Sequence, residues 1–319
     1  MLKALQVAAP LLVHPADVVH LGWVDLAGRC LDAMPLLDTP VVVTCHGSDL
    51  LINTLGDEQQ RSQIREVFEH VDLVHCISDD LRMHALELGL DPSKAFVCHF
   101  GIDTTFFHPD PWQQGIEGPA DEHQRRRLRV VSVGRLNWVK GYEYALQAIA
   151  QVQQAGVDIS YLILGGDSGG RLSALTAVRD LGLESCVSAP GLASRVEVCE
   201  ALRSADVFLL PSLSEGLNTA TLEAMSVGIP VVVTDVGGMR EAVTDGVDGF
   251  VVPPRDPDAI ANALLAIAKD PERRRQMGAH GRQRVEADFN ITTCTRTMNE
   301  EYNRLIDDRV RQVPTQSSS

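Results

Sequence analysis

Short runs of β-branched residues alternate with segments of helical periodicity along most of the chain. In the first part, apolar runs predict strands at 40–45, 72–78 and 95–100. Helical patterns predict helices at 57–70 and 79–89. Ser78 is placed to cap the second of these helices, and Gly89 to end it. This alternation is typical of βαβ units around a parallel sheet that is buried on both faces.

The pattern dissolves between about 104 and 124, where Pro, Gly and acidic residues replace apolar periodicity, so we expect a linker there. The alternation then restarts and predicts six strands, at 129–133, 160–165, 186–190, 206–211, 230–235 and 249–254. Helices are predicted at 256–268 and within 270–310. The predicted organisation is a first domain at 1–110, a linker at 111–128, a second domain at 129–290, a C-terminal helix at 291–312 and a disordered tail at 313–319.

The balance of charged residues argues against two classes of binding partner. The 319 residues include 28 Lys and Arg against 43 Asp and Glu, so the net charge is −15, which disfavours nucleic acid and electrostatic docking on anionic lipid. No apolar stretch approaches the roughly 18 to 20 residues of a spanning helix, so we expect no integral membrane segment. The opening MLKALQVAAPLLV faintly resembles a secretion signal, but a fold-like segment follows it without a spacer. The seven scattered cysteines indicate reduced core residues and a cytoplasmic protein, at most peripheral to a membrane.

The segment from Ser214 to Met225 carries the strongest chemical signal. It follows an apolar strand, and small residues lead into a helical pattern, so free backbone N–H groups should bind an anion such as a diphosphate. Glu215 and Glu223 are eight positions apart and can contact different parts of one elongated ligand, with sugar hydroxyls as natural donors to their carboxylates. The alternative is a solvated loop glutamate and a second glutamate that is favoured by the helix dipole.

The second candidate segment is a basic loop, GRLNWVKG at 134–141, which directly follows the strand at 129–133. Gly134 permits a sharp turn, and Arg135 and Lys140 place two cations at the strand end. Such cations suit an enzyme whose leaving group is a nucleoside diphosphate, since negative charge grows on that group in the transition state. The alternative is an ordinary basic loop.

Five motifs together resemble glycosyltransferase family 4, the group 1 transferases: VGRLNWVKG, SEGLNTATLEAMSVGIPVVVTDVGG, DGFVVPP, HGSD and FGID. The resemblance is specific over about 129–290 and looser before it. It implies a GT-B type fold of two Rossmann-like, doubly wound α/β domains that face a cleft, with a partial acceptor-side domain at 1–110 and a nucleotide-sugar-binding domain at 129–290. It also implies a retaining, nucleotide-sugar-dependent transferase without a metal or other cofactor.

By this resemblance, Arg135 and Lys140 would hold the donor diphosphate, Glu215 the transferred sugar and Glu223 the ribose. Further donor contacts would come from Gly134, the turn around Leu192 and the loop residues Gly216, Leu217, Asn218 and Thr219. His46 would reach the sugar from the first domain, although a single histidine at a strand end is more often structural. Gly101 and Asp103 would lie near the hinge.

The sequence departs from the family at Phe100, where an Asn is usual, and in the TATLE filling between the glutamates. Comparison with the family also suggests that the opening strands of the first domain are missing. An incomplete first domain would expose a sheet edge that a partner or a second copy covers.

Three other signals have structural interpretations. Asp256-Pro257-Asp258 resembles a metal-binding Asp-x-Asp pattern but is better explained as a helix N-cap, so we predict no metal site. The glycine-rich segment 165–170 lacks the dinucleotide fingerprint and predicts a strand-end turn that would line the cleft. The basic run 125–129 is interpreted as a solvated linker end.

The sequence therefore predicts a glycosyltransferase that moves a sugar from a nucleotide donor to a hydroxyl of a glycan, lipid-linked or small-molecule acceptor, as in polysaccharide biosynthesis. Two alternatives stay open. One is a nucleotide-sugar epimerase or hydrolase on the same fold, and the other is a shortened, non-catalytic nucleotide-sugar-binding module.

Overall fold

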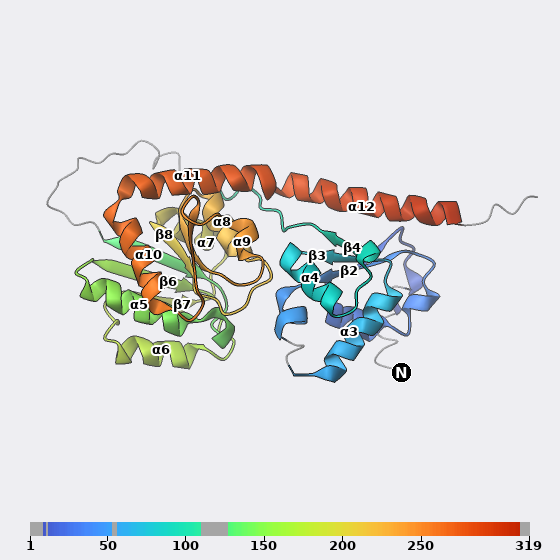
Figure 1. Ribbon diagram of the computed structural model, residues 1–319, viewed down its shortest axis with the longest axis horizontal. Coiled ribbons are helices and arrows are strands. Elements are labelled where there is room, and N and C mark those ends of the chain that lie inside the picture. Colours follow the sequence, from blue (N-terminus) through green and yellow to red (C-terminus); the bar gives the residue numbers. More distant parts are fainter. Residues whose placement is uncertain (1–8, 11, 53–55, 110–126, 313–319) are drawn as a thin grey trace, which may run out of the picture. The chain divides into compact units, whose positions relative to one another are not determined.

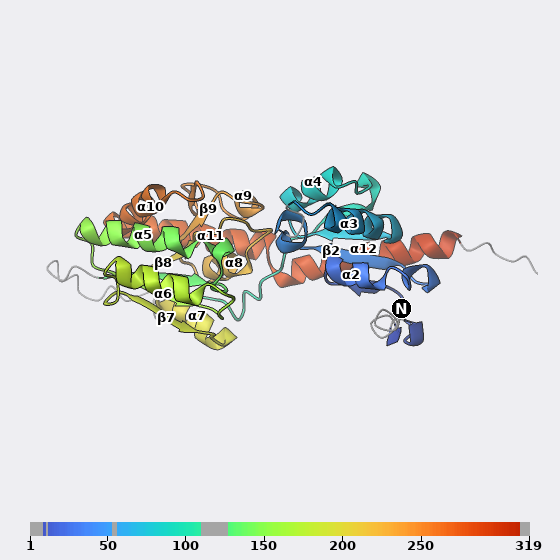
Figure 2. The same ribbon diagram turned by 90° about the horizontal axis from the view of Figure 1, so that it is seen from below.

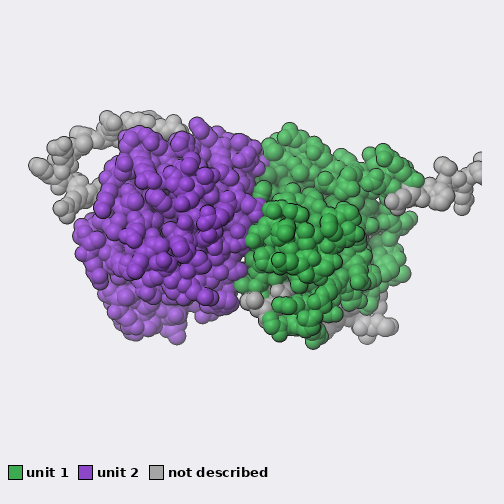
Figure 3. All heavy atoms as spheres, in the orientation of Figure 1, with its two compact units in different colours: residues 1–101, 292–319 green, residues 102–291 purple. Residues whose placement is uncertain are grey.

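The computed structural model describes residues 9–10, 12–52, 56–109 and 127–312, and it divides into two compact units. Unit 1 comprises residues 1–101 and 292–319, and unit 2 comprises residues 102–291 (Figure 3). Most of the predicted linker at 111–128 and the predicted tail at 313–319 lie outside the described residues.

Unit 1 is built on a four-stranded parallel sheet in the order β1-β2-β3-β4 (Figure 1). Its strands are β1 (Val19–Leu21), β2 (Val41–Cys45), β3 (Leu73–Cys76) and β4 (Ala95–Val97). Its helices are α2 (Val24–Cys30), α3 (Glu58–His70), α4 (Asp79–Glu87) and most of α12 (Ile291–Gln312). The three strands predicted for this part are confirmed, as is the Ser78 cap, which accepts a hydrogen bond from Leu81 N at 3.2 Å. The short β1 was not among the predicted strands.

Unit 2 is built on a six-stranded parallel sheet, and all six predicted strands are present. The sheet order is β10-β9-β8-β5-β6-β7, which is a doubly wound sheet in which the direction of winding reverses between β5 and β8. The strands are β5 (Leu128–Val133), β6 (Ile159–Leu164), β7 (Val187–Gly191), β8 (Val207–Leu210), β9 (Val231–Thr234) and β10 (Gly249–Val252). Ligands of such sheets bind at the carboxyl ends of the strands at the reversal.

Helices cover both faces of this sheet. One layer contains α5 (Tyr142–Gln154), α6 (Arg171–Asp180) and α10 (Pro257–Lys269), which Figure 2 shows side by side. The other contains α7 (Arg195–Ser204), α8 (Thr219–Ser226) and α11 (Pro271–Asp288), and the short α9 (Met239–Ala242) joins β9 to β10. Because both faces are covered, the central strands are fully buried along their length.

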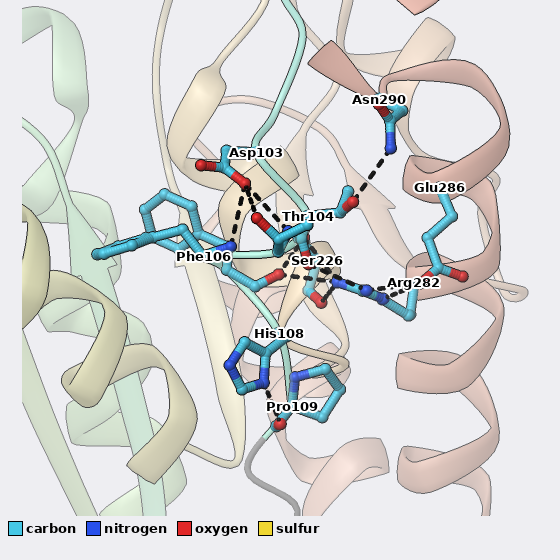
Figure 4. A network of polar contacts seen from close by, with 11 residues as sticks. Asp103, Thr104, Phe106, His108, Pro109, Ser226, Arg282, Glu286 and Asn290 are labelled. Carbon is cyan, nitrogen blue, oxygen red and sulfur yellow. Dashed lines mark hydrogen bonds and ion pairs between the residues drawn. The ribbon is translucent and has the colours of Figure 1, made fainter. Parts of the chain in front are cut away.

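The segment that enters unit 2 from unit 1 is tied to two of these helices (Figure 4). Arg282 of α11 donates to the carbonyl oxygens of Thr104 at 3.2 Å, Phe107 at 2.8 Å and Ser226 at 2.6 Å. The Ser226 hydroxyl of α8 donates to the same Phe107 oxygen at 2.5 Å. Residues 102–109 therefore pack with unit 2, and the division of the chain falls between Gly101 and Ile102.

Two of the three structural interpretations are confirmed, the Asp256 helix cap and the turn at 165–170. Asp256 caps α10 by accepting from Ala259 N at 2.9 Å. In the turn at 165–170, the Asp167 carboxylate accepts from the backbone N–H groups of Gly169, Gly170 and, at the start of α6, Arg171. The interpretation of the basic run 125–129 as a solvated linker end is wrong for Arg129, which lies in β5 and pairs with buried Asp206 at 3.0 Å; Arg125 and Arg126 lie outside the described residues.

Candidate functional site

The loops after β5 and β8 meet at the reversal of the unit 2 sheet. Gly141 has a left-handed backbone with φ of 61°, and a side chain there would overlap the carbonyl oxygen of Pro211. Leu213 N donates to Val139 O at 2.7 Å, which joins the two loops directly. Only glycine combines this φ with so close an approach, so Gly141 fixes the geometry of both loops.

The loop after β9 supports them from the other side. Gly237 has φ of 53°, and a side chain there would overlap the carbonyl oxygen of Glu215. Gly238 N donates to Gly216 O at 2.8 Å, and the buried Thr234 hydroxyl donates to Ser212 O at 2.5 Å. The loop that contains Glu215 is thus held between two neighbouring loops.

Three donors converge on one carboxylate oxygen, Glu215 Oε1. They are Lys140 Nζ at 2.5 Å, Ser212 Oγ at 2.6 Å and Asn218 Nδ2 at 3.3 Å. The Lys140 and Glu215 side chains are only 14% and 11% exposed. Among the described residues no donor reaches Oε2, so the second oxygen of this oriented carboxylate keeps its full accepting capacity.

Unpaired backbone donors lie beside this carboxylate. Asn218 caps α8 by accepting from Thr221 N at 3.0 Å. Among the described residues, the N–H groups of Gly216, Leu217 and Thr219 donate no hydrogen bond. Free N–H groups at a helix start attract anions, because they carry the positive end of the helix dipole. The loop therefore presents a carboxylate for hydroxyl groups and an amide cluster for an anion.

Arg135 adds an available cation. Its side chain is exposed and forms no ion pair within the described part of the chain. It follows Gly134, whose carbonyl oxygen accepts from the Tyr142 hydroxyl at 2.9 Å. Burial and the charge of Glu215 raise the pKa of Tyr142, so this hydroxyl stays protonated and acts as a fixed donor.

Leu192 is 87% exposed and lies close to Gly166 in the turn after β6.

Glu223 lies in the middle of α8 with a perturbed carboxyl. Burial raises its pKa to about 7, and Arg195 opposes this shift. No hydrogen bond joins this carboxyl to another described residue. A half-buried carboxyl without a donor is a candidate for a ligand hydroxyl.

Comparisons with known proteins agree with this geometry. Residues 119–284 match the family described as glycosyl transferases group 1, and residues 2–106 match glycosyltransferase family 4. The chain belongs to the group 1 glycosyltransferases. It is 33% identical over 307 residues to a colanic acid biosynthesis glycosyltransferase of Escherichia coli, covering 92% of this chain and 71% of that one. It is 30% identical over 308 residues to an amylovoran biosynthesis glycosyltransferase of Erwinia amylovora, covering 94% and 73%.

A solved structure shares the fold. The crystal structure of Anabaena HepE in complex with UDP-glucose aligns with a TM-score of 0.82 at 19% identity and covers 94% of this chain and 82% of that one. The predicted fold class, two parallel-sheet α/β domains of GT-B type, is confirmed.

The transferase brings most of the predicted donor residues together at one edge of unit 2. Lys140 and Glu215 are in direct contact, and Asn218 joins them. The remaining predicted donor residues lie in the same loops, in α8 or in the turn before α7: Gly134, Arg135, Leu192, Gly216, Leu217, Thr219 and Glu223. Their proposed contacts with a donor stay predictions.

His46 belongs to unit 1, directly after β2. Its Nε2 donates to Gly22 O at 2.9 Å, and its ring stacks on Trp23 and Phe100 with centroids 4.1 and 5.6 Å away. Burial lowers its pKa, so the ring is neutral at pH 7. Asp103, expected near the hinge, accepts from Phe106 N at 3.1 Å at the start of unit 2.

Sequence reasoning missed Ser212, which is fully buried and orients Glu215. The available signal was its place directly after Pro211, at the end of an apolar strand and three residues before Glu215.

The described residues contain no helix that is long and apolar enough to cross a bilayer. Among these residues, no three His, Cys, Asp or Glu side chains gather as metal ligands.

Proposed function

We propose that this transferase moves a sugar from a nucleoside diphosphate donor, such as a UDP-sugar, to a hydroxyl of a glycan, with retention at the anomeric carbon. The observation that carries the proposal is the cluster on Glu215 Oε1, with Oε2 available beside unpaired N–H groups. The HepE structure, which shares the fold, contains UDP-glucose.

The diphosphate would bind to Lys140, Arg135 and the N–H groups at the start of α8. The Lys140 ammonium group, whose Nζ lies 2.5 Å from Glu215 Oε1, would also donate a hydrogen bond to the phosphate. As the glycosidic bond breaks, negative charge grows on the leaving diphosphate, and these preorganised donors stabilise it. They supply the positive charge that a metal provides in other transferases, so the proposed reaction needs no metal.

Glu215 would hold the transferred sugar through Oε2, and Glu223 would accept hydroxyl hydrogens from the ribose. These assignments rest on family resemblance and on two carboxylates with free accepting capacity. Retention rests on the resemblance alone. A glycan acceptor in polysaccharide assembly is supported by the colanic acid and amylovoran relatives.

The decisive experiment combines Lys140→Ala and Glu215→Gln with a panel of UDP-sugars and glycan acceptors. We expect each variant to lower the transfer rate by about 10²–10³-fold, since each removes preorganised charge at the reacting centre. Glu215→Gln should keep most donor binding, as measured by calorimetry. Lys269→Ala, an exposed lysine at the end of α10, is the matched control and should match the wild type. Unchanged turnover in Lys140→Ala would remove the diphosphate assignment.

Donor incubated alone separates the alternatives. An isomerised sugar would identify an epimerase, and rapid release of free sugar would identify a hydrolase. Donor binding without transfer to any acceptor would identify a binding module. Product stereochemistry, read from the anomeric proton coupling by NMR, tests retention.

A further inference from the structure

Two thiols from distant parts of the chain meet in unit 1. Cys98 directly follows β4, and Cys294 lies in the first turn of α12, 196 residues further along. Cys98 Sγ donates to the Cys294 carbonyl oxygen at 3.5 Å, and its thiol also lies within hydrogen-bond reach of the Cys294 thiol. Neither side chain takes part in the proposed transfer.

The backbone keeps these two thiols together. Cys98 N donates to Cys76 O of β3 at 3.1 Å, and Cys98 O accepts from His75 Nε2 at 2.7 Å. The start of α12 is held where Ile291 N donates to Ile102 O at 3.0 Å. Because both backbone segments are fixed, small movements of the side chains suffice to bring the two sulfur atoms to bonding distance.

The two thiols are not equivalent. The hydrogen bond from the Cys98 side chain, assisted by His99, lowers the pKa of Cys294 to about 7, and the same bond raises the pKa of Cys98. A thiolate in the first turn of a helix is also favoured by the free N–H groups there. Cys294 is therefore the nucleophilic thiol, and Cys98 is its protonated neighbour.

The other cysteines are less prone to oxidation. Cys45 and Cys76 pair in register across β2 and β3, but both are fully buried, and their hydrogen bond and burial hold the pKa of Cys45 well above its usual value. Cys294 is 9% exposed, so a molecule as small as hydrogen peroxide can reach it. Burial raises the pKa of the remaining thiols: Cys30, Cys186 and Cys199.

We propose that Cys98 and Cys294 are a peroxide-sensitive thiol pair that closes reversibly to a disulfide between the end of β4 and the start of α12. The Cys294 thiolate attacks one oxygen of hydrogen peroxide. An S–O bond forms, the O–O bond breaks, and the leaving hydroxide becomes water with the proton that Cys294 released. The Cys98 sulfur then attacks the Cys294 sulfur, the S–O bond breaks, and a second water leaves with the Cys98 proton. The two thiols lose two electrons, and one peroxide is reduced to two waters.

This disulfide fastens the two segments by which the chain passes between its units, at 101–102 and 291–292. On the unit 2 side these segments are already paired, since Ile102 N donates to Phe289 O at 2.7 Å and Asn290 Nδ2 donates to Thr104 Oγ1 at 3.1 Å (Figure 4). The disulfide closes a loop that contains all of unit 2, so it restricts the unfolded chain. The inference does not depend on the proposed function.

The first test is treatment of the folded full chain with hydrogen peroxide, followed by unfolding in iodoacetamide and peptide mapping by mass spectrometry. The cross-linked Cys98–Cys294 peptide should be the first disulfide to form, and dithiothreitol should remove it. Cys45 and Cys76 are the matched control, a second pair of neighbouring thiols without exposure, and both should remain alkylated. Alkylation of both Cys98 and Cys294 at every peroxide dose that leaves the chain folded would overturn the pair.

The second test separates the roles of the two thiols. In Cys98→Ser the second thiol is lost but a hydroxyl donor remains, so Cys294 should stop at the sulfenic acid, which dimedone labels. In Cys294→Ser, Cys98 should take no dimedone. Cys186→Ser is the control variant and should form the disulfide as the wild type does. Dimedone on Cys98 but not on Cys294 would overturn the assignment of the nucleophile.

The third test measures the link between α12 and β4. Amide hydrogen exchange in the first turns of α12 should be about tenfold slower in the oxidised than in the reduced wild type. Peroxide should leave this exchange unchanged in Cys294→Ser. Equal exchange in the oxidised and reduced wild type would show that the disulfide does not fasten the helix, and would overturn the proposed link.

Discussion

Unit 1 and unit 2 both present the carboxyl ends of parallel strands, yet the two edges carry different chemistry. In unit 2 the edge has a partly buried ion pair, Lys140 with Glu215, and unpaired backbone donors. In unit 1 the edge has stacked rings around a neutral histidine, His46. The shared architecture determines where the loops lie, while the residues in those loops determine the charge and the shape that each edge presents.

The interior polar groups differ as well. A directional chain runs through unit 1 from the Tyr302 hydroxyl to His20 Nδ1, from His20 Nε2 to Thr44 Oγ1, and from Thr44 to His75 Nδ1, at 2.5, 2.7 and 3.0 Å. It ends where His75 Nε2 donates to Cys98 O at 2.7 Å. Every donor finds an acceptor only if both imidazoles are neutral, so the chain depends on uncharged histidines.

The largest loss of stability is expected from a substitution at Gly141, because the backbone there joins the two loops at the carboxyl edge of the unit 2 sheet. Gly141→Ala should destabilise unit 2 by about 3–5 kcal/mol, because the new methyl group overlaps the Pro211 carbonyl at a left-handed backbone position. Amide hydrogen exchange in β8 and calorimetric nucleotide binding measure the two consequences, while β3 in unit 1 should keep its protection.

Gly182→Ala is the control for this substitution. Gly182 has φ of 68° but no atom near the added methyl group, so only the backbone cost of about 1 kcal/mol applies. Equal losses in the two variants would show that the contact with Pro211 does not hold the loops together.

The sequence predicted the strands and loops of unit 2 better than the contacts between them. Apolar runs such as PVVVTD are buried on both faces and predict strands on their own. That Lys140 and Glu215 share an edge follows from the positions of their loops after neighbouring strands. Their direct ion pair depends on Gly141 and Ser212, whose roles appear only when the loops are packed.

Contacts that are made through backbone carbonyl oxygens could not be predicted from residue types, because every residue carries such an oxygen. The entry segment 102–109 contains Pro and Asp and resembles the start of a linker, but Arg282 recognises its carbonyl oxygens from 175 residues further along the chain. The same holds for β1, which is three residues long and is fixed through pairing with β2. Such long-range partners override local pattern.

A smaller loss of stability is expected in unit 1 when the pH falls. Burial lowers the pKa of His75 to about 4, from 6.5 in the unfolded chain. The unfolded state therefore binds a proton first, and unit 1 should lose about 3 kcal/mol as the pH falls from 6.5 to 4. His75→Gln should flatten this pH dependence of β3 hydrogen exchange, although its stability at pH 7 is lower. A burial-raised pKa of about 6 at Asp49 acts in the opposite direction, so the slopes of wild type and variant are compared directly. Identical slopes would exclude His75 as the source.

The smallest loss of stability is expected in unit 2, and it occurs as the pH rises rather than as it falls. Folded Glu223, with its pKa raised to about 7, keeps its proton to higher pH than the unfolded chain does near 4.5. The shift is as large as that of His75, but solvent screens the only partly buried carboxyl, so unit 2 should lose only about 1 kcal/mol as the pH rises from 4.5 to 7. Glu223→Gln should remove that loss. Ribose hydroxyls would donate to the ionised carboxylate, so nucleotide affinity should increase as the pH rises through 7 in the wild type and stay flat in Glu223→Gln. Calorimetric titrations with UDP at several pH values measure this directly. A wild-type affinity that falls with rising pH would place the carboxylate against phosphate, whose charge it repels, and would move the ribose contact away from Glu223.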